Sequence, residues 1–185
     1  MSNRRQQLLA SVAVLKAKHN RNNGAPAVGE IALTDKTIYI SKSLKGMGGI
    51  VKLIDVNTKK EVGVTNFDGN KLNVGRDYII DGVRVLTDGV ASNVKNSDWV
   101  KGTGGNVELV NCEIRIKQDN QLLFDMPISD ITNFNFDEFR DISTSPIIRS
   151  GEEFEIELEF PQGVSVASDN ELNIRIEFRV HQGKK

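Results

Sequence analysis

Residues 153–160 read Glu153-Phe154-Glu155-Ile156-Glu157-Leu158-Glu159-Phe160, with acidic and apolar side chains in strict alternation. A second such stretch, close to the C-terminus, reads Leu172-Asn173-Ile174-Arg175-Ile176-Glu177-Phe178-Arg179-Val180. Successive side chains of a β-strand point to opposite faces, so each stretch predicts a strand with one apolar and one polar face. This is typical of an antiparallel sheet that is wet on one side. We expect seven apolar side chains to face the core: Phe154, Ile156, Leu158, Phe160, Ile174, Ile176 and Phe178.

The two stretches admit two arrangements. As neighbours in one sheet, they would let Arg175 and Arg179 offset the repulsion among the four glutamates, because cross-strand charge pairs contribute about 0.2–1 kcal/mol each. The connection over residues 161–170 is too long for a tight hairpin, however. The other arrangement therefore places the two strands in facing sheets.

Strand signals dominate the chain from residue 31 onward. Six further stretches combine β-branched or aromatic residues with flanking turn formers, namely 31–41, 50–56, 61–67, 77–87, 107–118 and 121–127. Asp119-Asn120 lies between the last two and fits a two-residue hairpin turn. A short helix is expected at 136–142. With about eight to ten short strands in all, residues 28–185 are predicted to form an all-β body, an antiparallel β-sandwich or jelly roll.

Residues 88–106 show no periodicity and contain Trp99, the only tryptophan of the chain. Long loops without secondary structure are uncommon inside a compact domain and usually serve a function or are disordered. Trp99 fits two roles, as an anchor in the protein's own core or as an exposed contact with another subunit. We name it as a candidate subunit contact.

The N-terminal residues 1–27 differ in charge from the rest of the chain. Five of the 24 Lys and Arg residues precede Gly24, whereas all 25 Asp and Glu residues follow it, which leaves a formal charge of −6 on the remainder. Residues 3–20 predict a helix in which Leu8, Val12 and Leu15 form a narrow apolar stripe. Residues 20–26 follow as a tether. The cations of this arm are Arg4, Arg5, Lys16, Lys18 and Arg21.

The basic arm suits two kinds of partner. Its cations would bind nucleic acid without reading sequence, through phosphate contacts. Its apolar stripe would instead dock in a groove on a neighbouring subunit. The stripe favours the protein partner, because a purely electrostatic arm needs no leucine or valine.

Motifs that carry chemistry are missing from the sequence. It contains no serine elbow, zinc-protease motif or phosphate-binding loop, and its glycine-rich stretches lack the lysine that such a loop requires. Cys112 lies in an alternating run, which indicates a small core residue rather than a reactive thiol. His19 and His181 lack neighbouring ligands and are interpreted as solvated polar residues. We therefore expect no enzymatic activity, no catalytic residues, no metal and no cofactor.

One stretch, Ile147-Ile148-Arg149-Ser150-Gly151-Glu152-Glu153-Phe154, is followed by the two alternating strands and a short basic tail. In this arrangement the chain resembles jelly-roll capsid proteins of bacterial viruses. Its basic N-terminal helix on a tether is similar to the internal arm of such proteins. The resemblance implies a virion structural protein, either capsid or capsid-associated, whose β body packs against copies of itself or against other shell proteins. It assigns no role to any individual residue.

The alternative interpretation is a non-viral β-sandwich module that binds a ligand or glycan, with Tyr39, Tyr78 and Trp99 as the available polar-edged rings. No apolar run approaches the roughly 20 residues that span a bilayer, and the N-terminus is too polar for a signal peptide. The expected location is the virion, after synthesis in a host cytoplasm. The single cysteine rules out an intrachain disulfide and fits a reducing compartment.

Overall fold

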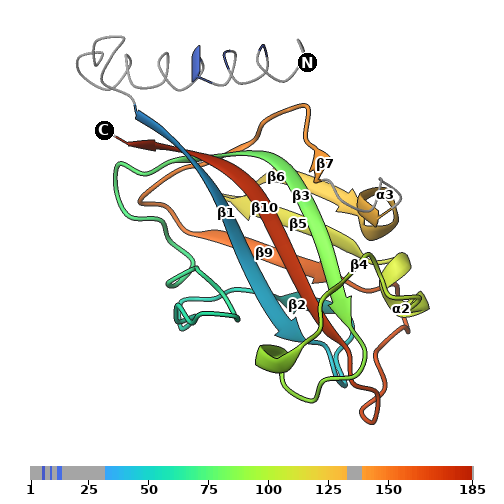
Figure 1. The fold of residues 1–185 in the computed structure, drawn as a ribbon. Coiled ribbons are helices and arrows are strands. Elements are labelled where there is room, and N and C mark those ends of the chain that lie inside the picture. The colour runs from blue at the N-terminus through green and yellow to red at the C-terminus, as the bar shows by residue number, and fades with distance from the viewer. Residues whose placement is uncertain (1–5, 7–8, 10–11, 14–31, 133–138, 185) are drawn as a thin grey trace.

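The structure is a computed structural model that describes residues 6, 9, 12–13, 32–132 and 139–184. The described chain forms two antiparallel sheets (Figure 1). In the first sheet the strand order is β1 (Ala32–Ser43), β10 (Asn173–Lys184), β3 (Tyr78–Asp88) and β4 (Val100–Lys101), and β7 (Arg140–Asp141) and β8 (Ile147–Ile148) also pair with β3. In the second sheet the order is β2 (Ile50–Lys52), β9 (Phe154–Glu159), β5 (Glu113–Gln118) and β6 (Gln121–Pro127).

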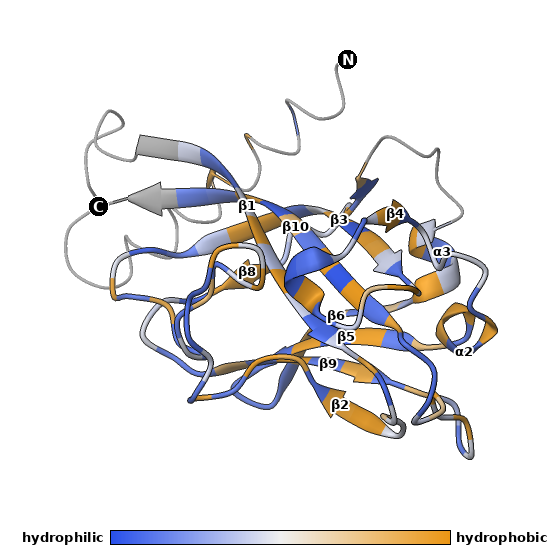
Figure 2. Ribbon diagram, turned by 60° about the horizontal axis from the view of Figure 1, so that its bottom comes forward, coloured by the Kyte–Doolittle hydropathy of each residue, from blue (hydrophilic) through white to orange (hydrophobic). Residues whose placement is uncertain are grey.

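The two sheets enclose one apolar core. All seven side chains predicted to face it are buried, and Phe154 and Phe178 are among the largest that solvent does not reach. Apolar and polar residues alternate along the long strands, as Figure 2 shows. Cys112 also lies in this core, and burial raises the pKa of its thiol to about 12. The predictions of an antiparallel β-sandwich and of a structural cysteine are confirmed.

The two alternating stretches lie in different sheets, since β9 belongs to the second sheet and β10 to the first. Of the two arrangements considered for these stretches, the structure therefore shows the one with the strands in facing sheets. The suggestion that Arg175 and Arg179 offset the glutamates of β9 is wrong, because those two arginines lie on the outer face of the other sheet. Arg175 pairs with Glu177 and Arg179 with Asp81.

Four local predictions differ from the structure. The strand expected at 50–56 ends at Lys52 as β2, because a turn follows in which the Asp55 side chain accepts the Asn57 N–H at 2.8 Å. Residues 61–67 form no strand but a turn-rich segment that lies along the free edge of β1, where the Ser41 N–H donates to the Val64 carbonyl at 2.7 Å. Residues 107–118 begin with a helical turn, α2 (Val107–Val110), before β5. The helix expected at 136–142 is replaced by β7 in its described part, and a short helix precedes it as α3 (Ile128–Thr132).

The segment along β1 protects an edge that would otherwise expose unpaired backbone groups. Asn66 accepts the Tyr39 N–H at 2.8 Å, and the Tyr39 hydroxyl accepts the Gly63 N–H at 3.2 Å. Exposed edge strands are templates for unwanted pairing with other chains, and covering them prevents it. The irregular segment therefore closes one side of the first sheet.

Candidate functional site

Most of the arm residues named from the sequence lie outside the described part of the chain. Val12 is described, is helical and is half-buried, and Gln6, Leu9 and Ala13 are also helical. The other seven candidates are not described: Arg4, Arg5, Leu8, Leu15, Lys16, Lys18 and Arg21. The arm therefore stays a prediction from the sequence.

Residues 88–106 form an ordered loop that begins at a buried carboxylate. Asp88 accepts N–H bonds from Val90 at 2.8 Å and from Asp98 at 2.9 Å, so its two oxygens hold both limbs of the loop. Desolvation works to raise the pKa of Asp88, but the N–H donors outweigh it and lower the pKa. Within the loop lie a 3-10 turn, η1 (Val94–Asn96), and the strand β4.

Trp99 lies at the outer face of the first sheet and not in the core. The Arg175 guanidinium stands 5.9 Å from the centre of the Trp99 ring and 3.9 Å from the centre of the Tyr39 ring. Its Nε also donates to Glu177 at 2.8 Å, and Arg84 donates to the other carboxylate oxygen. Trp99 is half-buried, so part of its side chain is reached by solvent.

His181 is buried rather than solvated, which corrects the interpretation from the sequence. It lies near the end of β10 and is 8% exposed. Its Nδ1 lies 2.7 Å from Asp35 Oδ1 on β1, and its Nε2 lies 2.9 Å from Asp81 Oδ2 on β3. The signal in the sequence was the continued alternation of Arg175, Glu177 and Arg179 to His181, which places it on the polar face of the strand. The two carboxylates come from distant parts of the chain and could not be assigned from the sequence.

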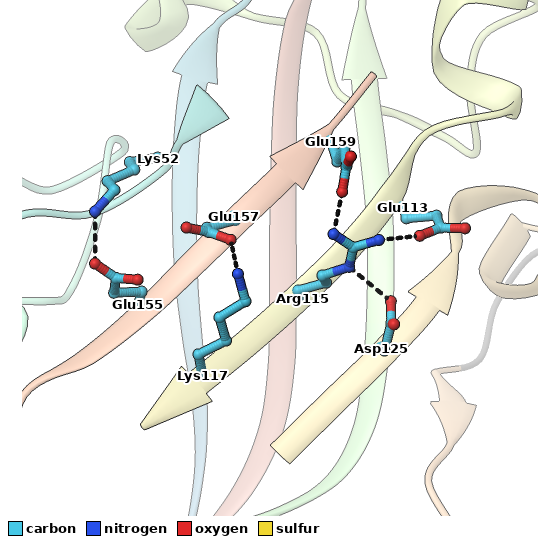
Figure 3. Close-up of polar contacts among 8 residues, drawn as sticks. All are labelled: Lys52, Glu113, Arg115, Lys117, Asp125, Glu155, Glu157 and Glu159. Atoms are coloured by element: carbon cyan, nitrogen blue, oxygen red, sulfur yellow. Dashed lines mark hydrogen bonds and ion pairs between the residues drawn. The ribbon is translucent and has the colours of Figure 1, made fainter. Parts of the chain in front are cut away.

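The outer face of the second sheet carries a ladder of ion pairs, drawn in Figure 3. Lys52 of β2 pairs with Glu155 at 2.5 Å, and Lys117 of β5 pairs with Glu157 at 2.6 Å. Arg115 contacts three carboxylates, from Glu113, Asp125 and Glu159. The ladder combines three cations with five carboxylates, so this face carries an excess of negative charge.

Two open hollows lie at the surface. One of about 540 Å³ surrounds the turn between β5 and β6 and is lined by Asn70, Lys117, Gln118, Asp119, Asn120, Glu152, Glu153 and Glu155. The other, of about 650 Å³, lies beside the loop that contains Trp99, and its lining includes Thr87, Asp88, Val90, Val100 and Asn106. In the part of the chain that the structure describes, no three His, Cys, Asp or Glu side chains are grouped to hold a metal ion.

No protein-family model, curated protein sequence or solved structure matches this chain. Within the described ranges, no helix is both long and apolar enough to cross a membrane.

Proposed function

We propose that the chain is a structural protein of a virus particle, a capsid or capsid-associated subunit built on a jelly roll. The observation that carries the proposal is the pairing of the strands. Leaving aside β4, which lies within the connection from β3 to β5, the described residues supply eight strand positions in order: β1, β2, β3, β5, β6, β7 with β8, β9 and β10.

The pairing follows a simple rule: the first position pairs with the last, the second with the second-last, and so on toward the middle of the series. β1 pairs with β10, β2 with β9, β3 with β7 and β8, and β5 with β6. Such a chain corresponds to one long antiparallel ribbon. Rolling that ribbon up brings β10 beside β3 and β9 beside β5, where both are found. A rolled ribbon of eight strands in two sheets is the jelly roll of viral capsid proteins and of lectin domains.

A fold alone does not assign a function, so the choice among jelly-roll proteins depends on other features. The space between the sheets is filled by apolar side chains, so contacts with partners fall on the outer faces and loops. The second sheet presents an acidic face, and the sequence attaches a basic arm to this acidic body. An acidic surface and a basic segment on the same chain favour contacts between copies, because opposite charges attract across an interface.

Sedimentation velocity of the purified full-length chain over a range of concentrations tests the proposal. We expect defined assemblies larger than a monomer. A variant that lacks residues 1–23 loses them at every salt concentration if the arm docks on a neighbouring subunit. If that variant still assembles and loses only nucleic-acid binding, the arm faces the genome instead. A full-length chain that stays monomeric at every concentration contradicts the proposal.

Two matched triple variants separate the two arm partners. Leu8→Ser, Val12→Ser and Leu15→Ser together remove the apolar stripe and keep the charge. Lys16→Gln, Lys18→Gln and Arg21→Gln together remove three cations and keep the stripe. Docking on a neighbour predicts that the first set abolishes assembly and the second weakens it less. Binding to nucleic acid predicts the reverse order, with a steep dependence on salt.

A ligand- or glycan-binding module is the second candidate, and the hollow of about 650 Å³ favours it. Such sites combine apolar surface with a few convergent polar groups, and this hollow offers Val90 and Val100 beside Thr87, Asp88 and Asn106. A glycan array probed with the full-length chain tests it. Specific binding that Asn106→Ala abolishes would favour the module over the shell subunit.

A further inference from the structure

The beginning of β1 is tied to the rest of the sheet through His181. β1 starts at Ala32, a few residues after the predicted arm of residues 1–27, and Asp35 is its fourth residue. Asp35 and His181 are direct partners in the register of β1 and β10. A contact between their side chains therefore holds the strand at the point where the arm joins the body. Figure 1 shows this point at one end of the sandwich, where β1 begins beside the end of β10.

A bulge in β3 supplies the second carboxylate of the cluster. In the register of β10 with β3, Arg179 faces Gly82 and Val180 faces Ile80, which leaves Asp81 as an extra residue. Bulges re-aim side chains in this way. Asp81 Oδ1 accepts from Arg179 at 2.7 Å while its Oδ2 faces His181. Among the described residues, Asp35 on β1 and Asp81 on β3 contact the imidazole itself. Arg179 on β10 binds Asp81 from the other side and also pairs with Asp141 on β7.

The geometry requires a doubly protonated imidazole. Carboxylate oxygens are acceptors only, and each ring nitrogen of His181 lies within 3 Å of one of them. A neutral imidazole has a single N–H, so the lone pair of its other nitrogen would point at a carboxylate oxygen. Both contacts are favourable only while His181 is an imidazolium.

The two carboxylates differ in what else holds them. Asp81 is 15% exposed and also binds Arg179, so it keeps a partner when His181 is neutral. The Asp35 side chain is 90% exposed and is free to turn into water. Loss of the proton therefore releases the Asp35 side chain and weakens the hold on the start of β1, which keeps its backbone pairing with β10, while Asp81 stays in place.

We propose that Asp35, His181 and Asp81 form a pH-dependent clamp at the root of the N-terminal arm. The imidazolium adds a side-chain tie between the first residues of β1 and strands β10 and β3, and its deprotonation lets these residues open more often. The hydrogen bond to Asp81 and both carboxylate charges raise the pKa of His181, so the clamp is closed at mildly acidic pH and opens as the pH rises.

Hydrogen–deuterium exchange of the full-length chain, followed by mass spectrometry across a pH series, tests the clamp. In this stretch only the N–H groups of residues 34 and 36 face β10, because the odd-numbered ones of β1 point to the other side. After correction for the base-catalysed intrinsic rate, the opening constant of these two amides is expected to rise by up to about tenfold per pH unit above 6.5. It levels off above the raised pKa of His181, which an NMR titration of the ring measures independently. Amides 83–86 of β3 serve as the internal reference and should stay protected.

Three variants sharpen the test. His181→Gln removes the charge and should show high, pH-independent opening of residues 34 and 36. Asp35→Asn alters an exposed side chain, so the fold is retained, and it should raise opening at low pH and flatten its pH dependence. His19→Gln removes the other histidine of the chain and should behave as the unaltered protein.

The clamp is refuted if opening of residues 34 and 36 does not change through the NMR titration of His181. It is also refuted if His181→Gln and Asp35→Asn keep the pH dependence of the unaltered protein, or if His19→Gln removes it. None of these outcomes depends on whether the protein assembles, so the clamp and the proposed function fail independently.

Discussion

At the scale of single residues, burial of His181 between two carboxylates makes the free energy of unfolding depend on pH. The pKa of His181 is raised above its ordinary 6.5, chiefly by the hydrogen bond to Asp81. Its contribution to stability is therefore complete below pH 6.5 and is lost as the pH rises through the raised value. Urea denaturation over a pH series should show this loss in the unaltered protein. In His181→Gln the free energy of unfolding should change little over the same window, and an equal decline in that variant would contradict the assignment.

Asp81 of the same cluster titrates in a different window. Desolvation raises its pKa, but the bonds from His181 and Arg179 outweigh that effect and lower it below 3.8. Its contribution is present above the ordinary carboxyl pKa and is lost only as the pH falls through the lowered value. The stabilising contributions of Asp81 and His181 are therefore lost in two separate pH ranges, that of Asp81 in acid and that of His181 above pH 6.5.

Among single residues, the burial of apolar side chains was predicted from the sequence, whereas the burial of polar side chains was not. Alternation identified the residues of the core and the buried Cys112, because burial of apolar side chains follows the local period of a strand. His181 was assigned to solvent, since the partners that bury it, Asp35 and Asp81, are more than 95 positions away in sequence. No local pattern reports contacts of that range.

At the scale of elements, the hairpin turn between β5 and β6 was predicted from two residues. Asp119 and Asn120 have φ of 53° and 58°, the left-handed values of the hairpin turn that favours Asn and Gly. Asn120→Gly should therefore leave thermal stability unchanged or raise it. Asn120→Val should lower the free energy of unfolding by roughly 1–2 kcal/mol, because a β-branched residue is strained at this φ. Equal stability of the two variants would contradict the turn assignment.

The ladder on the second sheet contains two lysine–glutamate pairs that differ in burial. The side chain of Glu157 is 7% exposed and that of Glu155 is 40% exposed, and each binds one lysine. Lys117→Met leaves the Glu157 carboxylate buried without its cation and should cost roughly 1–3 kcal/mol of unfolding free energy. Lys52→Met affects an exposed, solvent-screened pair and should cost less than Lys117→Met. Chemical denaturation of the two variants measures the difference, and a larger cost for Lys52→Met would contradict the burial of Glu157.

Elements were predicted well where the pattern is long and poorly where it is short. Strands β9 and β10 fall on the two alternating stretches, and β1 and β3 fall on long stretches of strand-forming residues. Residues 61–67 have strand-forming composition, but Gly63 adopts a φ of 86° and the segment turns to cover the edge of β1. Helices α2 and α3 have four and five residues, too few for a helical period to show in the sequence.

At the scale of the whole molecule, Trp99 is the predicted contact for assembly. The ring is half-buried over Arg175 and contributes nothing to the core between the sheets. Trp99→Ala should therefore weaken association by at least about tenfold while leaving the fold intact. Trp99→Phe keeps a ring over Arg175 and should weaken association less. Sedimentation and thermal denaturation of both variants separate the two effects. A loss of stability without a loss of association would make Trp99 a fold anchor instead.

Two facing sheets could be predicted for the whole molecule, but their strand order could not. The number of strands, the polar outer faces and the long connection at 161–170 together favoured a sandwich. The pairing of β1 with β10 joins residues at opposite ends of the body, and the ion pairs of the ladder join β2, β5, β6 and β9. Such pairings depend on how the ribbon is rolled, which no single stretch of sequence records.

Native mass spectrometry of the purified full-length protein would show whether this chain assembles, as we propose for a shell subunit. A single chain has a mass of 20.5 kDa. We predict discrete multiples of that mass, in numbers that fit a closed point group, since shell subunits associate through repeated symmetric contacts. A spectrum that contains only the 20.5 kDa species at every concentration would contradict this proposal.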